Sequence, residues 1–186
     1  MVCPERARRT FTRMSGGRRQ RAMELRVATA SDVMGVARLA ASVVPEAGSD
    51  ADWCGRLSRD VAERDRSLFV AVLGSALVGY TRLGLVQSEA SAPDGWYLLG
   101  LIVSPEHRRT GVAAGLIRLA AAEASRRTDV LWSFYDVGND ASCLLHARLG
   151  FREVARGCIG FPGLSPDSRD VLVRMALRGD PADPPP

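Results

Sequence analysis

The chain has 186 residues, of which 46% are hydrophobic and 25% are charged, so it is long enough for one globular domain with a sizeable core. No apolar run is long enough to cross a membrane, and no apolar segment follows the basic N-terminus, which excludes a secretory signal. The four cysteines, Cys3, Cys54, Cys143 and Cys158, have neither metal-ligand nor CxxC spacing. We therefore expect reduced thiols, no bound metal and a cytoplasmic protein.

The net charge of +4 is concentrated at the N-terminus. Residues 1–22 contain seven arginines and one acid, Glu5, whereas the rest of the chain holds 18 arginines and 20 acids. This segment has few large apolar residues and cannot bury enough surface to fold alone. We expect a disordered leader over residues 1–22, with Met14 and Met23 as alternative starts. The other interpretation is a nucleic-acid-binding arm, which we disfavour because only Phe11 is interleaved with the arginines.

Between residues 23 and 178 the predicted order is strand, helix, helix, three strands, helix, strand, helix and two strands. Strands are predicted at residues 24–28, 68–73, 76–86, 96–103, 130–137, 151–159 and 171–177. Helices are predicted after Ser31, after Ser49 or Asp50, after the turn at Gly111, and after Asn139 or Asp140. Gly74-Ser75 predicts a tight hairpin turn. The proline-rich residues 179–186 are expected to form a disordered tail.

A candidate anion site lies where the apolar strand at residues 96–103 leads into a basic turn and a helix. The first amides of a helix lack intrahelical acceptors, and the helix dipole adds positive potential there. Gly111 has no side chain, so a phosphate can approach its amide closely. Arg108 and Arg109 add guanidinium groups whose forked donors suit phosphate oxygens. The turn has neither the Gly-Lys-Ser/Thr of a Walker loop nor the three glycines of a dinucleotide fingerprint.

Three motifs, in this order along the chain, resemble the GNAT superfamily of N-acetyltransferases over residues 24–178. They are the Gly74-Ser75 hairpin with Val78-Gly79-Tyr80, the pattern Val103-x-Pro105-x-x-Arg108-x-x-Gly111-x-Ala113, and the stretch from Asn139 through His146 to Leu149-Gly150-Phe151. The resemblance implies a single α/β domain over residues 23–178 with the GNAT fold. That fold has a mixed, mostly antiparallel sheet, splayed between its fourth and fifth strands and flanked by helices.

The same resemblance implies acetyl-CoA as a co-substrate and the residues that bind it. The pantetheine arm would pair with the backbone of Leu101, Ile102 and Val103, with Gly100 marking a bulge. The pyrophosphate would lie on Arg108, Arg109, Thr110, Gly111, Val112, Ala113 and Ala114. Asn139 and His146 would contact the cofactor from the last helix.

The implied chemistry is direct attack of a primary amine on the thioester, with the backbone amide of Ile102 donating to the oxyanion. Many members of the superfamily carry a glutamate on the fourth strand as base and a tyrosine in the last helix as acid. Here the fourth strand, WYLLGLIV, has no acid, and His146 stands at the tyrosine position. His146 is therefore the candidate general acid, and no base is assigned. The other interpretations of His146 are packing beside Leu145 and Leu149, or a nucleophilic pair with Cys143, which direct transfer does not need.

We therefore expect an acetyl-CoA-dependent N-acetyltransferase that acts on a small-molecule or peptide amine, with neither a membrane nor a nucleic acid as partner. The first alternative is a non-catalytic acyl-CoA-binding module, because the fourth strand lacks an acid. The second is a nucleic-acid-binding protein that works through the N-terminal arginine arm. The acceptor amine, the acyl-chain preference and the oligomeric state, a homodimer included, are left open.

Overall fold

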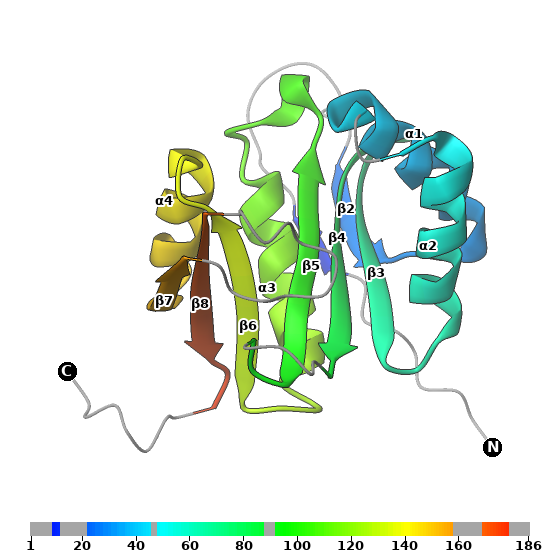
Figure 1. Cartoon of the computed structure of the whole chain (residues 1–186). Helices are drawn as coiled ribbons and strands as arrows, with labels where there is room; N and C mark the ends of the chain where they lie inside the picture. Colours follow the sequence, from blue (N-terminus) through cyan, green and yellow to red (C-terminus); the bar gives the residue numbers. More distant parts are fainter. Residues whose placement is uncertain (1–8, 12–21, 46–47, 88–91, 158–168, 179–186) are drawn as a thin grey trace. The chain divides into compact units, whose positions relative to one another are not determined.

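The computed structural model describes residues 9–11, 22–45, 48–87, 92–157 and 169–178. Its strands are hydrogen-bonded in the order β1-β2-β3-β4-β5-β6-β8-β7 (Figure 1). The pair β5–β6 is parallel, whereas β1–β2, β2–β3, β6–β8 and β7–β8 are antiparallel. The predicted mixed, mostly antiparallel sheet with flanking helices is therefore confirmed.

The chain divides into two compact units, Met1–Arg82 with Gly100–Leu119, and Leu83–Leu99 with Ala120–Pro186. Three elements contribute residues to both units: β4 (Ala76–Val86), β5 (Gly95–Val103) and α3 (Val112–Ala124). The first unit also holds β1 (Arg9–Phe11), β2 (Met23–Val27), η1 (Ala30–Asp32), α1 (Val33–Val43), α2 (Asp50–Ala62), β3 (Arg66–Leu73) and η3 (Pro105–His107). The second holds β6 (Val130–Asp136), α4 (Asp140–Arg148), β7 (Arg152–Gly157) and β8 (Asp170–Ala176).

In the first unit, α1 and α2 pack against one face of β3 (Figure 1). Their predicted apolar stripes are buried together with Leu68 and Val70 of that strand. The other face of the same strands meets α3, since a Cβ on Gly115 would come within 2.5 Å of Leu25 on β2. Leu25 is paired with Ala71, whose side chain alternates with that of Val70. Helices therefore cover both faces of this part of the sheet.

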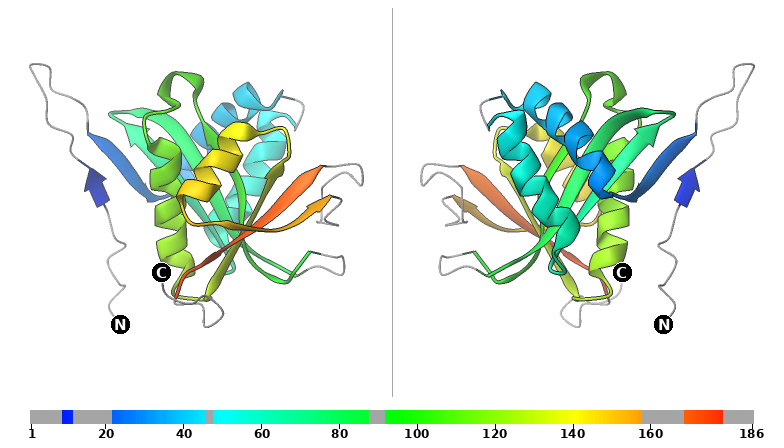
Figure 2. Two further views of the ribbon diagram at one scale, coloured as in Figure 1. Left: turned by 90° about the vertical axis from the view of Figure 1, so that its left-hand side faces the viewer. Right: turned by 90° about the vertical axis from the view of Figure 1, so that its right-hand side faces the viewer.

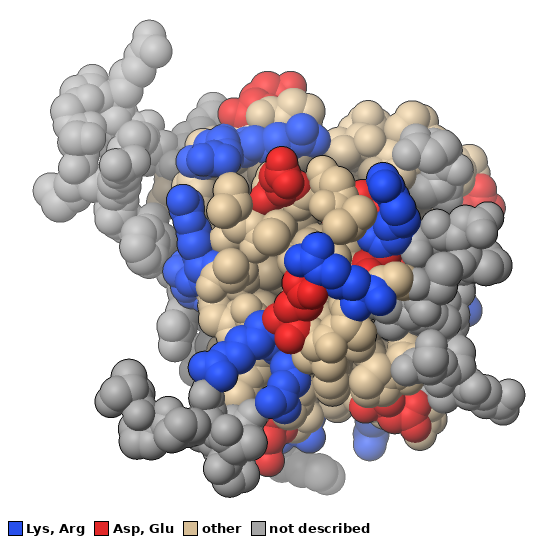
Figure 3. Space-filling view, turned by 60° about the vertical axis from the view of Figure 1, so that its left-hand side comes forward, with Lys and Arg blue, Asp and Glu red and all other residues tan. Residues whose placement is uncertain are grey.

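In the second unit, α4 packs against the face of β6 that carries Ser133 and Tyr135 (Figure 2). The opposite face carries an apolar cluster in which Tyr97 and Leu172 are buried and Trp132 and Phe134 are partly buried. Strand β7 is the edge strand of the sheet. All six of its residues are exposed, and charged side chains of both signs alternate over the face in Figure 3. Charges on an edge strand oppose pairing with another chain.

The parallel pairing of β5 with β6 is short. It joins Trp96 to Leu131 and Tyr97 to Trp132. Both strands continue beyond this point, but their parallel register ends at Tyr97 and Trp132. The strands that the sequence analysis numbers fourth and fifth are β5 and β6, so the predicted splay lies where it was expected.

One element was not predicted. Arg9–Phe11 forms β1 and pairs with Met23–Leu25 of β2, inside the segment expected to have no structure. Pairing with an edge strand uses backbone groups alone, so no side-chain pattern announces it. The remainder of the predicted leader and the tail at residues 179–186 lie outside the described residues. Cys54 and Cys143 are free thiols, and Cys3 and Cys158 also lie outside the described residues.

Candidate functional site

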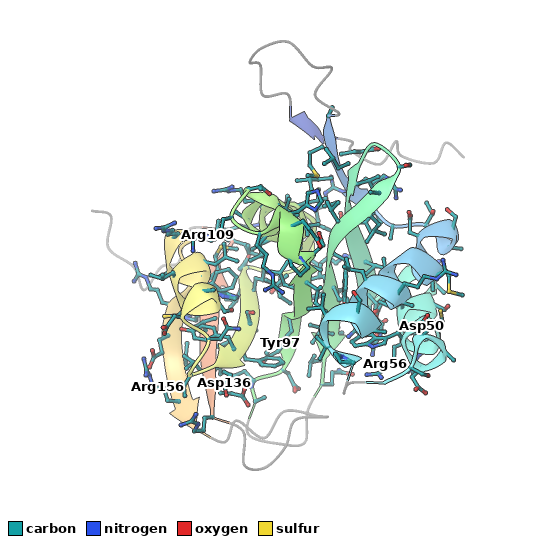
Figure 4. All side chains as sticks on the ribbon, turned by 90° about the horizontal axis from the view of Figure 1, so that it is seen from above. Asp50, Arg56, Tyr97, Arg109, Asp136 and Arg156 are labelled. Atoms are coloured by element: carbon teal, nitrogen blue, oxygen red, sulfur yellow. The ribbon has the colours of Figure 1, made fainter. Side chains whose placement is uncertain are left out.

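The turn between β5 and α3 is held by its own hydrogen bonds. The Ser104 amide donates to Val78 of β4 at 2.9 Å, and the Ser104 hydroxyl lies 2.8 Å from His107 Nδ1. The Thr110 hydroxyl donates to the His107 carbonyl at 2.6 Å. These contacts make His107 a structural residue of the turn. Arg108 and Arg109 remain exposed, and Figure 4 labels Arg109.

Left-handed backbone occurs twice in this turn, at Arg109 with φ 63° and at Gly111 with φ 89°. Such a conformation is strained for a residue with a side chain, and it concentrates at functional sites. Alternating backbone of this kind also aims successive amides at one point, which favours an anion. A Cβ added to Gly111 would meet no atom within 4 Å, so the space above its backbone is open.

Helix α3 begins with unpaired amides. Its first intrahelical bond runs from the Gly115 amide to the Gly111 carbonyl at 3.0 Å. Among the described residues, no acceptor is bonded to the amides of Val112, Ala113 and Ala114. Unpaired amides, the helix dipole and two exposed guanidinium groups therefore coincide at the predicted pyrophosphate position. This arrangement suits a bound phosphate.

Residues 100–103 of β5, with Ser104 directly after it, show which backbone groups face β4. The Gly100 carbonyl accepts from the Thr81 hydroxyl at 2.8 Å, and the Ser104 amide donates to Val78. The Ile102 carbonyl also lies on this side, since it would be 3.1 Å from a Cβ on Gly79. The amide and carbonyl of one strand residue point to the same side. The Ile102 amide therefore points toward β4, which corrects the prediction that it donates to an oxyanion.

Leu101 and Val103 have the opposite orientation. Backbone groups alternate along a strand, so the carbonyls of both residues lie on the side away from β4. The Val103 carbonyl accepts from Arg108 Nε at 3.3 Å. The Leu101 and Val103 amides consequently face away from β4, as a strand-like ligand would require. Gly100 has φ 123° and is exposed, in keeping with the predicted bulge. Thr81 was not predicted as a contact of β5; its signal in the sequence is a small hydroxyl side chain within a mostly apolar strand.

In the second unit, Asn139 caps α4. Its side-chain oxygen accepts from the Ser142 amide at 3.0 Å, so the predicted cap is confirmed. Its side-chain nitrogen is bonded to no described residue. One donor of Asn139 is thus available to a ligand while the oxygen holds the helix.

His146 is buried, with 5% of its surface exposed, and both of its ring nitrogens have partners. Nδ1 lies 2.8 Å from the Ser142 carbonyl, which can only accept, so Nδ1 carries the proton. Nε2 then accepts from the Ser133 hydroxyl at 2.9 Å. Burial lowers the pKa of His146, opposed by the bond to Ser142. The ring is therefore neutral at pH 7.

Aromatic rings surround His146. Tyr135 stacks on it with centroids 5.3 Å apart, and Phe151 meets it edge-on at 4.9 Å. Burial, followed by a hydrogen bond to Cys143, raises the pKa of Tyr135 to about 12. Tyr135 is thus a neutral phenol, and Cys143 is its partner. The described hydrogen bonds of the His146 side chain are with Ser133 and Ser142, and its ring contacts are with Tyr135 and Phe151; none of these is with Cys143.

The comparisons with known proteins identify the family. A family model described as "Acetyltransferase (GNAT) family" matches residues 34–151, more than half of the 186 residues. The chain belongs to the GNAT acetyltransferase family. No curated protein matches the chain in sequence. None of the helices in the described part of the chain combines the length and apolar content that a membrane span requires.

Solved structures of this family share the fold of the chain. YncA of Salmonella typhimurium, bound to acetyl-CoA, is 19% identical, with a TM-score of 0.66 over 86% of this chain and 96% of its own. A phosphinothricin acetyltransferase of Sinorhizobium meliloti, also with acetyl-CoA, is 18% identical, with a TM-score of 0.69 over 88% and 93%. AAC(6')-Iy, in complex with the bisubstrate analogue CoA-S-monomethyl-acetylneamine, is 21% identical, with a TM-score of 0.64 over 72% and 93%.

Proposed function

We propose that this GNAT acetyltransferase transfers an acetyl group from acetyl-CoA to a primary amine by direct attack. The observation that carries the proposal is the start of α3, where unpaired amides of Val112, Ala113 and Ala114 adjoin the open backbone of Gly111. Coenzyme A carries a pyrophosphate, which suits unpaired amides at a helix start. The bound acetyl-CoA of two similar structures supports the same co-substrate.

In this proposal the cofactor residues are those predicted from the sequence, except that the Ile102 amide is left out because it points toward β4. Arg108, Arg109, Thr110 and Gly111, with the first amides of α3, hold the pyrophosphate. The outward amides of Leu101 and Val103 pair with the pantetheine arm, and the side-chain nitrogen of Asn139 donates to it. The acceptor is a small molecule, which is supported by the name of the phosphinothricin acetyltransferase and by the acetylneamine part of the analogue bound to AAC(6')-Iy.

The oxyanion donor is reassigned to the Leu101 or Val103 amide. When the amine attacks, negative charge develops on the thioester oxygen, and a backbone amide that is already oriented stabilises it without reorganisation. The Ile102 amide cannot serve because it points toward β4, with the Ile102 carbonyl facing Gly79. Replacing an amide by an ester at position 101 or 103 would separate these two donors.

We also propose His146 as the general acid, a role that depends on a change in its hydrogen bonds. The neutral ring donates its single proton to Ser142 and accepts from Ser133. Protonation of a leaving thiolate by His146 therefore requires Nε2 to release its bond to Ser133 and take up a second proton first, since only the imidazolium form can give a proton away and stay neutral. The thiolate, with a pKa of ~8.5, gains from a proton donor near neutral pH. Water is the other donor.

A non-catalytic acyl-CoA-binding protein is the second candidate, favoured by one observation. The described β5 strand, Gly95–Val103, has no carboxylate to act as a base. Two measurements separate the candidates. Calorimetry with acetyl-CoA is expected to show binding in both cases. Release of free coenzyme A with a panel of primary amines is expected only for the enzyme, and binding without release over the whole panel would contradict transfer.

A further inference from the structure

Two carboxylates lie opposite each other where β6 pairs with β8. Asp136 and Asp170 are direct partners in this antiparallel pair, so their side chains leave the same face of the sheet with Cβ atoms ~4.5–5.5 Å apart. The Asp136 Oδ1 atom accepts from the Gly138 amide at 2.7 Å. Asp136 is exposed at the carboxyl end of β6, whereas Asp170 has only 6% of its surface exposed.

Asp170 has a buried oxygen, Oδ2, without a hydrogen-bond partner. Within the described ranges no guanidinium is paired with either carboxylate. Arg156 is opposite Val171 and is bonded to Glu153. Arg174 is on the same face of β8 as Asp170 but four residues along, ~14 Å away. Burying a carboxylate without a compensating charge is costly, so the pair is set up for a cation from outside the chain.

The surroundings of the pair suit an organic cation. Side chains alternate along β6, so Trp132, Phe134 and Asp136 share one face, away from α4. Both aromatic residues are partly exposed, and Tyr97 stacks on Trp132 with centroids 6.2 Å apart. Figure 4 labels Tyr97 and Asp136. Aromatic faces attract ammonium groups and pack against the methylenes that carry them.

The position in the sheet also suits a substrate. In open sheets, ligands bind beyond the carboxyl ends of parallel strands where neighbouring strands diverge. Asp136 is the last residue of β6, and the pairing of β5 with β6 stops at Tyr97 and Trp132. The acidic pair and its aromatic neighbours thus lie at the diverging end of β6.

We propose that Asp136 and Asp170 bind a second cationic group of the acceptor, so that the enzyme selects α,ω-diamines and larger polyamines over simple amines. An ammonium group has three donors and can bridge the two carboxylates. The aromatic side chains hold the alkyl chain between the bound ammonium group and the amine that is acetylated. This inference rests on the proposed acetyl transfer, whose substrate class it names.

The test compares three four-carbon amines that differ in the second group. The second group is cationic in 1,4-diaminobutane, absent in 1-aminobutane and anionic in 4-aminobutanoate. Diamines with three to six methylenes test other distances between the two nitrogens. We expect kcat/KM for the preferred diamine to exceed that for 1-aminobutane by about tenfold or more, with 4-aminobutanoate slowest. Asp136→Asn and Asp170→Asn should each lower the diamine preference about tenfold, with little change for 1-aminobutane.

Asp129→Asn is the matched control. Asp129 is exposed and directly precedes β6, at the opposite end of that strand from Asp136, and its replacement removes the same charge. It should leave the preference unchanged. Equal rates for diamine and monoamine, or a preference that survives Asp136→Asn and Asp170→Asn, would overturn the inference while acetyl transfer stands.

If no amine is acetylated, calorimetry with 1,4-diaminobutane tests the cation subsite separately from the proposed acetyl transfer. Binding to the parent protein that is lost in Asp136→Asn supports the subsite and contradicts the transferase. Absence of both binding and turnover contradicts both proposals. Melting temperatures of all variants show whether a lost preference reflects unfolding, and the isosteric Asn variants are expected to stay folded.

Discussion

Gly111 is the residue whose replacement tests the pyrophosphate site most directly. Gly111→Glu puts a carboxylate into the open space beside the unpaired amides of α3, where it competes with a phosphate by charge and bulk. We expect loss of measurable acetyl-CoA binding in calorimetry. Gly111→Ala is the matched control. The backbone φ of 89° at this position destabilises any residue with a side chain by about 1–2 kcal/mol, so the alanine variant has this effect without the charge. Unchanged acetyl-CoA affinity in Gly111→Glu would contradict the assignment of the pyrophosphate site to this turn.

Asp32 provides a prediction about pH. Its two carboxylate oxygens bond the Arg26 guanidinium at 2.7 and 2.8 Å. These bonds, with help from Thr29, lower the pKa of Asp32 to about 2. A lowered carboxyl pKa stabilises the folded state above the unfolded pKa of ~3.9, and this stabilisation is lost as pH falls toward 2.

Asp32→Asn should therefore reduce the free energy of unfolding by about 1 kcal/mol at pH 7, allowing for solvent screening, and by much less at pH 2–3. Denaturant unfolding at both pH values measures this difference. Asp50→Asn, an exposed acid in the first turn of α2, is the control. Equal destabilisation by Asp32→Asn at both pH values would show that Arg26 is not the cause.

His146 can be tested because packing and acid catalysis predict different kinetics. As the general acid, His146→Phe would lower kcat by ~10²–10⁴-fold with little change in acetyl-CoA affinity. Ser133→Ala removes only the bond at Nε2 and should retain activity, because it frees that nitrogen. A parental kcat in His146→Phe across the pH range would leave His146 with the packing role that its burial supports.

At the scale of elements, the cap of α4 links stability to the proposed cofactor contact. Asn139→Ala removes the bond to Ser142 and should cost about 1 kcal/mol in the free energy of unfolding. Asn139→Ser keeps a capping oxygen but lacks the side-chain nitrogen. We expect Asn139→Ser to restore stability and leave acetyl-CoA affinity reduced, measured by denaturant unfolding and calorimetry. Restored affinity would mean that Asn139 is only a cap.

The elements themselves follow closely from local sequence. Ser49 caps α2 by accepting from the Asp52 amide at 3.3 Å, and the turn at Gly74, with φ 66°, joins β3 to β4. Both were predicted, because caps and tight turns depend on one or two residue types. The pairing of β1 with β2 was not, because backbone pairing on an edge leaves no side-chain signature.

At the scale of the whole molecule, we expect the fold to tolerate removal of the N-terminal segment. A chain that begins at Met23 loses three paired residues of β1, and the described core residues all follow Met23. We expect a small change in melting temperature and unchanged acetyl-CoA affinity, measured by calorimetry of both chains. A large loss of melting temperature would show that the segment before Met23 is part of the folded domain.

The order of the elements and the candidate anion turn were predicted from local sequence, and the family was predicted from the resemblance of three motifs. Apolar periodicity, capping residues and Gly111 act over a few residues and can be read in order. The backbone direction at Ile102 was decided only by the tertiary structure, because alternation along β5 depends on its bonds to β4. The environment of His146 also needed it, since Nε2 accepts from Ser133, which is 13 residues away.

Asp136 and Asp170 show most clearly the difference between what local sequence predicts and what only the tertiary structure decides. Asp136 and Asp170 are separated by 34 positions, and each looks in sequence like an ordinary loop-edge acid. Register between β6 and β8 makes them direct neighbours on one face with two aromatic side chains. A register shift of one residue would send either carboxylate to the other face. Chemistry that depends on two strands is therefore decided by their pairing, which no local pattern specifies.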